Sequence, residues 1–338
     1  MSENQQESIS RRRFVRGAGA AALGAAVTAA PPVAAKADAG SLPRRVLGKT
    51  GLKVTRMTLG TAPAGIAKTI SPADVAAVVN EALDLGVNFV DTSPKYGNAE
   101  EGVGLALGRR RQQILLATKI WADTVAEAEQ KLAQSLATLK TDYVDVLYFH
   151  NLGGRDVQKA REPDGVFTWL LKQKQAGKCR FVGVSGHHLP DRFPAFLETG
   201  QVDVILVNVN FVDRHTYGFE EKVLPLARKH DVGIVAMKVF GGPDPATGSW
   251  GNPQAKPYVG QDRVDLAIRY ALSLPGVATA NLGVHNVEQV RQNVEFVKNF
   301  RPLSAEERET LDKLGRQLAS QWGPHFGPLT EEEAAAGE

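Results

Sequence analysis

From about residue 56 onward, short apolar runs alternate with longer amphipathic stretches along the chain. The apolar runs are rich in β-branched residues, which is typical of strands buried on both faces of a parallel sheet. The predicted strands are Arg56–Leu59, Asn88–Asp91, Ile114–Thr118, Tyr143–Phe149, Phe181–Ser185, Val204–Val209, Gly233–Met237 and Ala278–Leu282. The predicted helices are Pro72–Leu85, Val125–Leu139, Gly165–Gln175, Asp262–Leu274, Val287–Lys298 and Ala305–Leu318. Strands that alternate with helices predict an α/β fold with a parallel sheet.

Eight strands with helices between them predict that this sheet closes into a (β/α)8 TIM barrel. The alternative is an open doubly wound sheet, which would carry a G-x-G-x-x-G turn after its first strand. The turn after Leu59 reads G-T-A-P instead, so the barrel is favoured. Two further short runs, Arg44–Leu47 and Leu52–Thr55, are separated by glycines and predict an N-terminal β-hairpin. We expect the barrel to occupy residues 44–320, after a linker at 38–43, with a partly disordered tail at 321–338.

The segment before the barrel has the order of a bacterial signal peptide. Residues Ser10–Arg16 read S-R-R-R-F-V-R, the apolar run Gly17–Ala30 follows, and small residues lead to Ala37. Paired arginines before a phenylalanine are typical of the twin-arginine route. We therefore predict cleavage after Ala37, export by the twin-arginine translocase, and a periplasmic or extracellular protein. The alternatives are an uncleaved membrane anchor or a chance basic tail, although the apolar run is short for a bilayer span.

Charge and cysteine content narrow the class of protein. The formal net charge is +3, and the first 37 residues account for all of it. The rest of the chain is neutral and predicts no nucleic-acid surface. Cys179 is the only cysteine, which excludes an intrachain disulfide and a multi-cysteine metal site. No stretch after the first segment is long and apolar enough to span a bilayer, so no stable membrane insertion is expected.

Polar residues follow three successive predicted strands. Asp91 ends the second strand and Tyr96 follows it in the loop, Lys119 comes just after the third strand, and His150 comes just after the fourth. The active site of such a barrel lies where strands end and loops begin, so these four side chains are expected to face one mouth.

This set of side chains suits proton transfer to an alkoxide that forms when hydride adds to a carbonyl. A free tyrosine has a pKa near 10, and a nearby ammonium favours tyrosinate, so we expect Lys119 to lower the pKa of Tyr96. Asp91 would keep Lys119 charged and aimed. His150 could donate a hydrogen bond that orients the substrate oxygen.

Further segments carry a family resemblance. They are R-R-V-L-G-K-T-G-L-K-V-T-R-M-T-L-G-T at Arg44–Thr61, N-F-V-D-T-S-P-K-Y-G-N-A-E at Asn88–Glu100, L-L-A-T-K-I-W at Leu115–Trp121, D-Y-V-D-V-L-Y-F-H at Asp142–His150, V-G-V-S-G-H at Val182–His187, and G-V-H-N-V-E-Q-V-R-Q-N at Gly283–Asn293. With these motifs the chain resembles the aldo-keto reductase superfamily over about residues 44 to 318.

The resemblance implies an oxidoreductase that moves hydride between NADP(H) and a carbonyl or alcohol, with NAD(H) also possible. Tyr96 would give the proton, Lys119 and Asp91 would adjust the pKa of Tyr96, and His150 would orient the carbonyl. The cofactor supplies the hydride, and the protein supplies position and charge. A monomer is the default state of the family.

The resemblance also implies cofactor contacts, several of which depart from the family pattern. The candidates are Gly60, Thr61, Ser185, Gly186, Asn208, Met237, Lys238, Gln289 and Asn293. Ser185 matches the serine that holds the carboxamide, but Gly186 stands where an Asn is usual. The position that usually carries a Gln falls on Leu206. Asn208, two residues later, faces the same side of the predicted strand and could replace that Gln.

Three more cofactor positions matter for affinity and preference. Met237 falls where a residue, often aromatic, stacks under the nicotinamide, and Lys238 falls where a pyrophosphate or ribose contact is expected. Gln289 stands where many members have an Arg for the 2′-phosphate. Because Gln does not replace the charge of a guanidinium, preference for NADP(H) is weakened in this chain.

The substrate pocket is expected to involve Trp121 and His187, with the long Gly- and Pro-rich loop Gly241–Gln261 as a cover. The substrate itself is open among sugars, aldehydes, ketones and steroids. One alternative function is a dinucleotide-binding redox sensor or regulatory barrel with little turnover. Another is a metal-dependent isomerase or hydrolase, which would want several His and carboxylates converging at the strand ends.

Overall fold

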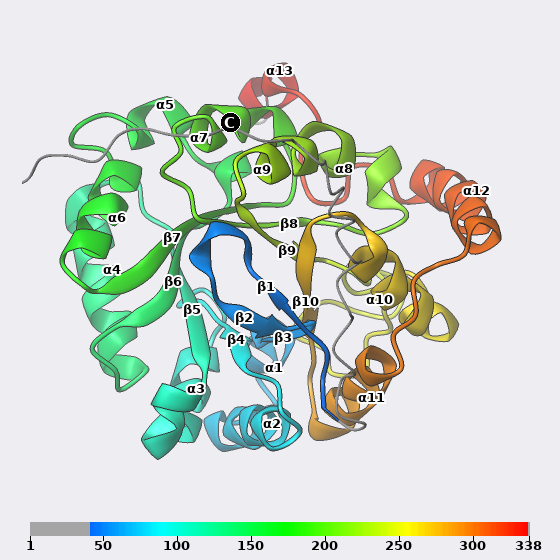
Figure 1. The fold of residues 1–338 in the computed structure, drawn as a ribbon, viewed down its shortest axis with the longest axis horizontal. Coiled ribbons are helices and arrows are strands. Elements are labelled where there is room, and N and C mark those ends of the chain that lie inside the picture. Colours follow the sequence, from blue (N-terminus) through cyan, green and yellow to red (C-terminus); the bar gives the residue numbers. More distant parts are fainter. Residues whose placement is uncertain (1–40, 337–338) are drawn as a thin grey trace, which may run out of the picture. The chain divides into compact units, whose positions relative to one another are not determined.

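The computed structural model describes residues 41–336, and the predicted signal peptide with its cleavage point lies outside them. Eight parallel strands close into a barrel in the order β10-β3-β4-β5-β6-β7-β8-β9 (Figure 1). The strands are β3 (Met57–Gly60), β4 (Phe89–Asp91), β5 (Leu115–Ile120), β6 (Val144–Phe149), β7 (Cys179–Gly186), β8 (Val204–Asn208), β9 (Gly233–Met237) and β10 (Val277–Gly283). The predicted barrel is confirmed, and each strand falls where the apolar runs place it.

Helices surround the barrel (Figure 1). The longer ones are α2 (Pro72–Asp84), α3 (Ala99–Leu107), α4 (Val125–Thr138), α6 (Val166–Gln175), α10 (Val264–Ser273), α11 (Val287–Lys298) and α12 (Ala305–Trp322). Shorter pieces are α1 (Ala62–Ile66), α5 (Val157–Ala160), α7 (Pro194–Leu197), α8 (Phe219–Lys222) and α9 (Leu224–Lys229), with 3₁₀ turns at Gly48–Thr50, Gly108–Gln113, Leu152–Gly154, Pro190–Arg192, Asp213–His215 and Gln261–Arg263. All six helices predicted from the amphipathic stretches are present, whereas α3 and the short pieces were not predicted.

The N-terminal end of the barrel is closed by the predicted hairpin, which is confirmed as β1 (Arg44–Val46) and β2 (Lys53–Thr55). Its apolar residues Leu47 and Val54 pack into the same cluster as the inward-facing side chains of the strands. Gly48 lies against the backbone of residues 231–233 with φ +48°, so a side chain there would meet both strain and main chain. The hairpin therefore seals one end and leaves ligand access to the other.

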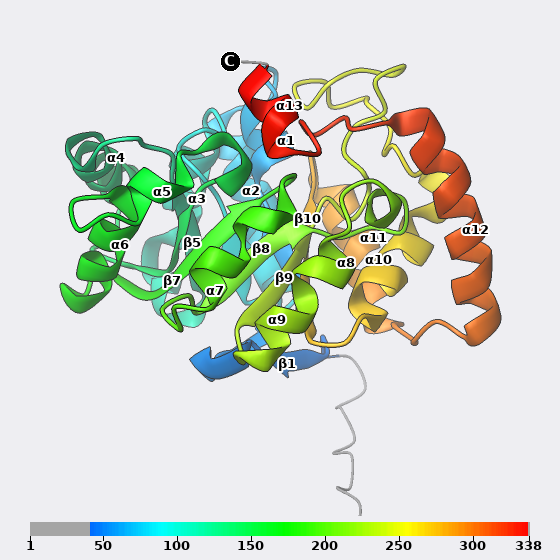
Figure 2. The same cartoon turned by 90° about the horizontal axis from the view of Figure 1, so that it is seen from above.

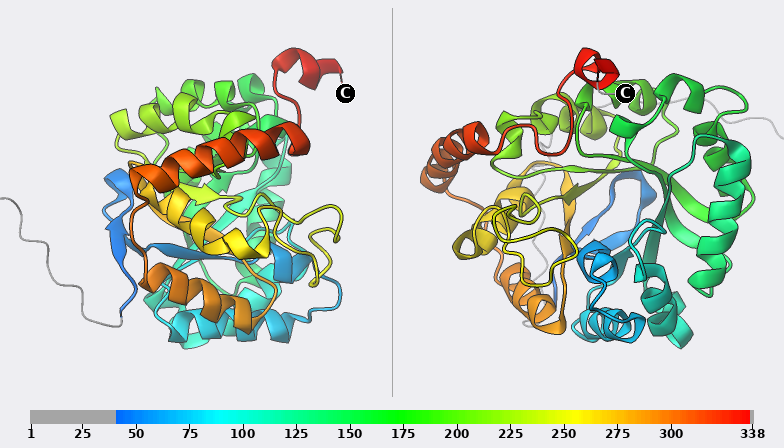
Figure 3. Two further views of the ribbon diagram at one scale, coloured as in Figure 1. Left: turned by 90° about the vertical axis from the view of Figure 1, so that its right-hand side faces the viewer. Right: turned by 180° about the vertical axis from the view of Figure 1, so that it is seen from behind.

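The opposite end carries the long loop 241–261, drawn in yellow in Figures 2 and 3. Its Tyr258 stacks on Trp322 at 4.0 Å between ring centroids and an interplanar angle of 6°. Its Trp250 carbonyl lies 3.3 Å from Nε2 of His285, which follows β10. The loop thus contacts both the end of α12 and the residue that follows strand β10 beside the mouth.

The C-terminal tail contacts the barrel at several described residues, and its expected partial disorder stays a prediction. Helix α13 spans Glu331–Ala336, and Arg192 Nε donates to Glu331 at 2.7 Å. His325 Nε2 lies 3.1 Å from the buried Asp213. The tail also contributes apolar packing, because Trp322, Phe326 and Leu329 pack against the main hydrophobic core.

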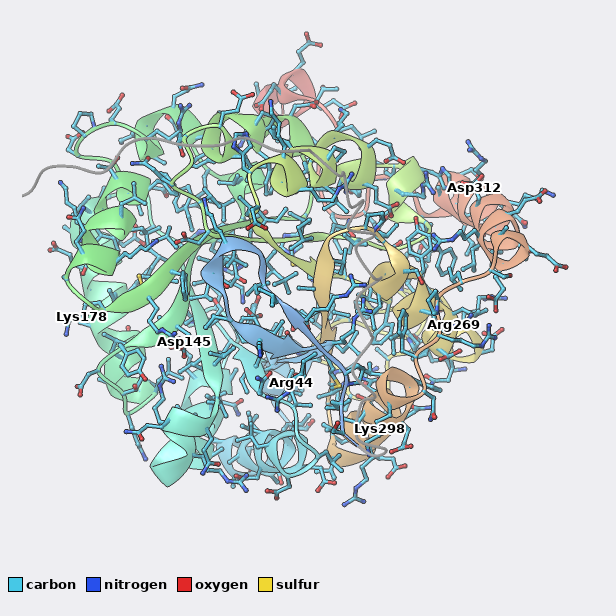
Figure 4. All side chains as sticks on the ribbon, viewed as in Figure 1. Arg44, Asp145, Lys178, Arg269, Lys298 and Asp312 are labelled. Carbon is cyan, nitrogen blue, oxygen red and sulfur yellow. The ribbon has the colours of Figure 1, made fainter. Side chains whose placement is uncertain are left out.

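Charged clusters away from the mouth hold the outer layers together (Figure 4). Asp145 pairs with Arg111 at 3.0 Å and with Arg180 at 2.7 Å. The buried Arg269 pairs with Glu307 at 2.7 Å and so fixes α12 to α10. Within residues 41–336, no helix is both long and apolar enough to cross a membrane.

Candidate active site

Four predicted side chains meet at the C-terminal end of the barrel. The two-residue period of a strand turns Asp91 and Lys119 inward from neighbouring strands β4 and β5. Lys119 Nζ donates to Asp91 Oδ2 at 2.6 Å and to the Thr92 carbonyl at 2.8 Å. The same ammonium lies 4.7 Å from the ring centroid of Tyr96, and its charge favours the ionised form of the Tyr96 hydroxyl. A phenol, an ammonium and a carboxylate therefore form one connected chain.

Tyr96 keeps its proton in this arrangement. Burial raises the pKa of its hydroxyl above the usual value, Lys119 lowers it, Asp91 raises it, and the net direction is upward. Lys119 lowers this pKa as expected, but the cost of burying a tyrosinate exceeds the attraction of the ammonium, so the net shift is upward.

The Lys119–Asp91 pair is held by a residue that the sequence did not indicate. Burial lowers the pKa of Lys119, but attraction from Asp91 and Tyr96 outweighs this and raises the pKa overall. Burial raises the pKa of Asp91, opposed by Lys119 and by Asn281, whose amide donates to Oδ2 at 3.0 Å. Lys119 therefore remains an ammonium, with its counter-ion fixed from two sides.

His150 lies beside Tyr96 as a neutral imidazole. The two rings meet edge to face with centroids 6.1 Å apart, and Ser93 Oγ lies 3.5 Å from His150 Nδ1. Burial, followed by the charges of Lys119 and Lys238 and then of other cations, holds the pKa of His150 well below its usual value. A neutral ring can donate one hydrogen bond to a ligand oxygen without releasing a proton to it.

A cleft opens from this centre toward α11. Among the predicted residues, its wall contains Asp91, Tyr96, Gly60, Met237, Lys238, His187, Gln289 and Asn293. Asn286 caps α11 by accepting from the Gln289 N–H at 3.0 Å, and the Gln289 side chain accepts from the His285 N–H at 2.7 Å. The far part of the cleft is thus formed by the first turns of a helix, where backbone N–H groups favour an anion.

Ser185 and Gly186 lie at the end of β7, outside the cleft wall. Ser185 Oγ accepts from the Asn151 N–H at 3.0 Å. A Cβ on Gly186 would come within 2.9 Å of the buried Phe193 ring. The usual Asn at this position would therefore require the Phe193 ring to shift.

Asn208 faces inward but is engaged away from the cleft. Its amide nitrogen lies 3.2 Å from Asp213 Oδ2 and 3.3 Å from the His187 carbonyl, and its oxygen accepts from Asn210 at 3.2 Å. The structure therefore places it in a buried amide network and does not bring it to the cleft as a replacement for the usual Gln.

Thr61 and Trp121 lie next to the centre rather than in the cleft wall. Thr61 donates through both its N–H and its hydroxyl to the Asp91 carbonyl, at 3.1 and 3.0 Å. Trp121 meets His150 edge to face at 5.4 Å, with Lys95 and Arg155 within 4.7 and 4.1 Å of its ring centroid. Both residues shape the surroundings of the four central side chains.

Several residues of the cleft were not named individually as site residues from the sequence. Asn281 lines it from β10, His285 and Gln292 lie within the predicted motif at 283–293, and Trp250 lies in the long loop that was expected to cover the site. An inward-facing Asn at the end of a buried strand was the one available signal for Asn281. Among the residues that the structure describes, no group of three or more His, Cys, Asp or Glu side chains could hold a metal ion.

Comparison with known proteins decides the family. The sequence matches the Aldo/keto reductase family over residues 56–246. It is 31% identical to L-galactose dehydrogenase of Arabidopsis thaliana, in an alignment that covers 80% of this chain and 92% of the relative. The chain belongs to the aldo/keto reductase family. This aldo/keto reductase is therefore an oxidoreductase, and the predicted resemblance is confirmed.

Solved structures agree with the assignment. An aldo-keto reductase from Bacillus halodurans, AKR11C1 in its holo form, is 26% identical with a TM-score of 0.68, and the match covers 87% of this chain and 99% of that one. An aldo/keto reductase from Klebsiella pneumoniae in complex with NADP and acetate shares the fold, with 24% identity, a TM-score of 0.64, and coverage of 80% and 94%. The aldo/keto reductase barrel thus extends over nearly all of the described residues.

Proposed function

We propose that this protein is an NADP(H)-dependent reductase of carbonyl compounds in which Tyr96 donates the proton. The observation that carries the proposal is the buried Lys119 ammonium, which lies 2.6 Å from Asp91 and 4.7 Å from the ring centroid of Tyr96, at the cleft wall that Asp91 and Tyr96 form. A binding module has no need of a protonated phenol beside a buried, paired ammonium. An enzyme that must protonate an alkoxide does.

Each residue has one task in the proton transfer. Tyr96 holds its proton at neutral pH because burial raises its pKa. Lys119 stabilises the phenolate that remains after the proton leaves, since the ammonium is already positioned against the ring. Asp91 and Asn281 keep that ammonium in place. His150, as a neutral donor, orients the carbonyl oxygen toward the Tyr96 hydroxyl.

The cleft fits a nicotinamide cofactor. Two buried oxygens in its wall, Asp91 Oδ1 and Asn281 Oδ1, have no hydrogen-bond partner among the described residues. Beyond them, Met237, Gln289 and the buried Asn293 would hold the dinucleotide along the first turns of α11. The bound nicotinamide would supply the hydride.

Preference between NADP(H) and NAD(H) depends on the 2′-phosphate end. Gln289 lines the cleft without a charge there, so binding of the phosphate relies on the helix terminus of α11. NADP(H) remains our proposal because related reductases bind it, and NAD(H) is the competing cofactor. Without a guanidinium that binds the 2′-phosphate through two hydrogen bonds, this phosphate adds less to the affinity for NADP(H).

Export completes the proposal. The first 37 residues would direct the folded protein through the twin-arginine translocase, so that it acts outside the cytoplasm. Replacing Arg11 and Arg12 by Lys keeps the charge but removes the arginine pair. We expect this variant to accumulate in the cytoplasm while the natural sequence is exported. Equal export of both forms would refute the route.

The reductase proposal is tested by titrating the purified protein with NADPH and NADH and following nicotinamide fluorescence. We expect saturable binding of NADPH, followed by turnover with simple aldehydes that persists in EDTA. Binding without turnover across a broad aldehyde panel would favour the redox sensor instead. Binding of neither cofactor to protein shown to be free of nucleotide would overturn the proposal.

A further inference from the structure

Lys238 is a charged side chain of the cleft that has no ion-pair or hydrogen-bond partner among the described residues. It follows β9 directly, and its ammonium lies 4.0 Å from the ring centroid of Trp250 and 5.3 Å from that of Phe326. Among residues 41–336, no carboxylate lies within 4.0 Å of its Nζ, and no protein group accepts a hydrogen bond from it. Its three N–H donors are therefore available to a ligand.

The backbone at Lys238 supports a role for this placement. Its φ is +57°, in the left-handed region that side chains other than Gly, Asn and Asp seldom adopt. The conformation is fixed by two bonds to its carbonyl, from the Asn210 amide at 3.0 Å and the Gly241 N–H at 2.7 Å. The surrounding structure thus maintains an unfavourable conformation that points the ammonium at the cleft.

Asp213 contributes negative charge to this region but is not a salt-bridge partner. Its Oδ2 accepts from the amides of Asn208 and Asn210 at 3.2 and 2.6 Å, and its Oδ1 lies 3.1 Å from His325. Both oxygens are therefore occupied within the protein. The carboxylate whose charge acts on Lys238 is therefore already bound to other groups.

The surroundings of the proton-transfer centre carry an excess of positive charge. The charges of Lys119, Lys238, Lys95 and Arg155 all lower the pKa of His150. Two carboxylates at this mouth already have cationic partners, because Asp91 pairs with Lys119 and the exposed Asp123 pairs with Arg155 at 2.6 Å. A low-dielectric cleft of one sign attracts ligands of the other.

We infer that the enzyme takes carbonyl substrates that carry a carboxylate, and that Lys238 binds this carboxylate. The inference rests on the proposed reductase function and names the substrate class for the same site. Sequence position suggested a pyrophosphate or ribose contact for Lys238. Its ammonium lies against the rings of Trp250 in the loop and Phe326 in the tail, and the Phe326 ring lies 5.9 Å from that of His187. These neighbours place the ammonium on the side of the cleft that carries His187.

The test compares matched acids and esters. We would measure kcat/KM for 2-, 3- and 4-carboxybenzaldehyde and for the corresponding methyl esters, with the natural enzyme, Lys238→Met and Lys238→Arg. The control is Lys53→Met, which removes the same charge from the hairpin at the far end of the barrel. We expect Lys238→Met to lose at least about tenfold on one or more of the acids and less than about twofold on the esters.

Three outcomes would overturn the inference and leave the reductase intact. One is an equal loss on acids and esters. Another is no loss on any acid. The third is a loss of NADPH affinity of about tenfold or more in Lys238→Met, which would assign the ammonium to the cofactor phosphates.

A measurement without turnover separates this inference from the proposed function. Binding of benzoate and of methyl benzoate is followed by tryptophan fluorescence, because Trp250 lies against Lys238. We expect benzoate to bind more tightly than its ester, and Lys238→Met to abolish that difference while Lys53→Met keeps it. If no nicotinamide binds but this pattern holds, the reductase proposal fails and the carboxylate site stands. If benzoate and its ester bind alike, the carboxylate site fails.

Discussion

The side-chain amide of Asn281 donates at 3.0 Å to the same Asp91 oxygen that receives the Lys119 ammonium. The contact joins β10 to β4 across a separation of 190 residues. It fixes the carboxylate that keeps Lys119 charged, so Asn281 is a positioning residue for the proton donor Tyr96.

Replacing Asn281 tests this role. Asn281→Ala removes one donor from a buried carboxylate, and we expect kcat to fall roughly tenfold. Asn281→Asp places a second carboxylate beside Asp91, and the loss should be larger because like charges repel at this distance. Steady-state kinetics checks the order, with circular dichroism to show that both variants fold. An Asn281→Ala enzyme with unchanged kcat would contradict the assignment.

Gly186 is expected to be intolerant of the Asn that is usual in the family. A Cβ there approaches the buried Phe193 ring to 2.9 Å, and we expect Gly186→Asn to lower the free energy of unfolding by about 1–3 kcal/mol. Gly177→Asn is the control, since that position is open and Asn tolerates its left-handed backbone. Denaturant unfolding measures both. Equal stability of Gly186→Asn and the natural protein would show that Phe193 can move aside.

Cofactor preference should respond to charge at position 289. Gln289→Arg adds a fork that can pair with a 2′-phosphate, and we expect the ratio of NADPH to NADH affinity to rise about tenfold. Gln289→Ala also loses the bond to the His285 N–H but adds no charge, so the ratio should stay unchanged. Fluorescence titration gives both ratios. A rise with Ala as well would point to the lost hydrogen bond rather than to charge.

The acid-to-ester ratio of kcat/KM is predicted to depend on pH. Burial, followed by the charge of Lys119, lowers the pKa of Lys238 to about 8, with Asp213 opposing. The ammonium is therefore present below about pH 8 and is lost as the pH rises through this value. We expect the ratio to fall over that range, and to stay flat in Lys238→Arg because a guanidinium remains charged. Titration of Tyr96 or His150 changes kcat/KM for acids and esters alike, so it cancels in the acid-to-ester ratio. A ratio that is flat in the natural enzyme would count against the carboxylate site.

Local sequence patterns were sufficient for much of the fold. Apolar runs and helix caps mark the eight strands and six of the helices, because each signal lies within a few residues. Helix α3 was missed because Gly102 and Gly104 lower its helix propensity. The structure shows what these glycines do: a Cβ on Gly102 would meet Val75, and one on Gly104 would meet the Thr138 carbonyl.

Contacts between distant segments limited the prediction of the site. Asp91, Tyr96, Lys119 and His150 could be placed together because parallel strands end at one face. Asn281 had no partner nearby in the sequence, and the aromatic neighbours of Lys238 come from a loop and the C-terminal tail. The direction of the Tyr96 pKa depends on burial, which local sequence does not report.

Tyr96→Phe tests the central claim most directly. The substitution removes only the hydroxyl, so NADPH affinity should remain within about twofold, while aldehyde reduction should fall on the order of 10²–10⁴-fold. Cofactor titration and nicotinamide oxidation are measured on the same preparation. If Tyr96→Phe binds NADPH normally and reduces aldehydes as fast as the natural enzyme, Tyr96 is not the proton donor and the account is contradicted.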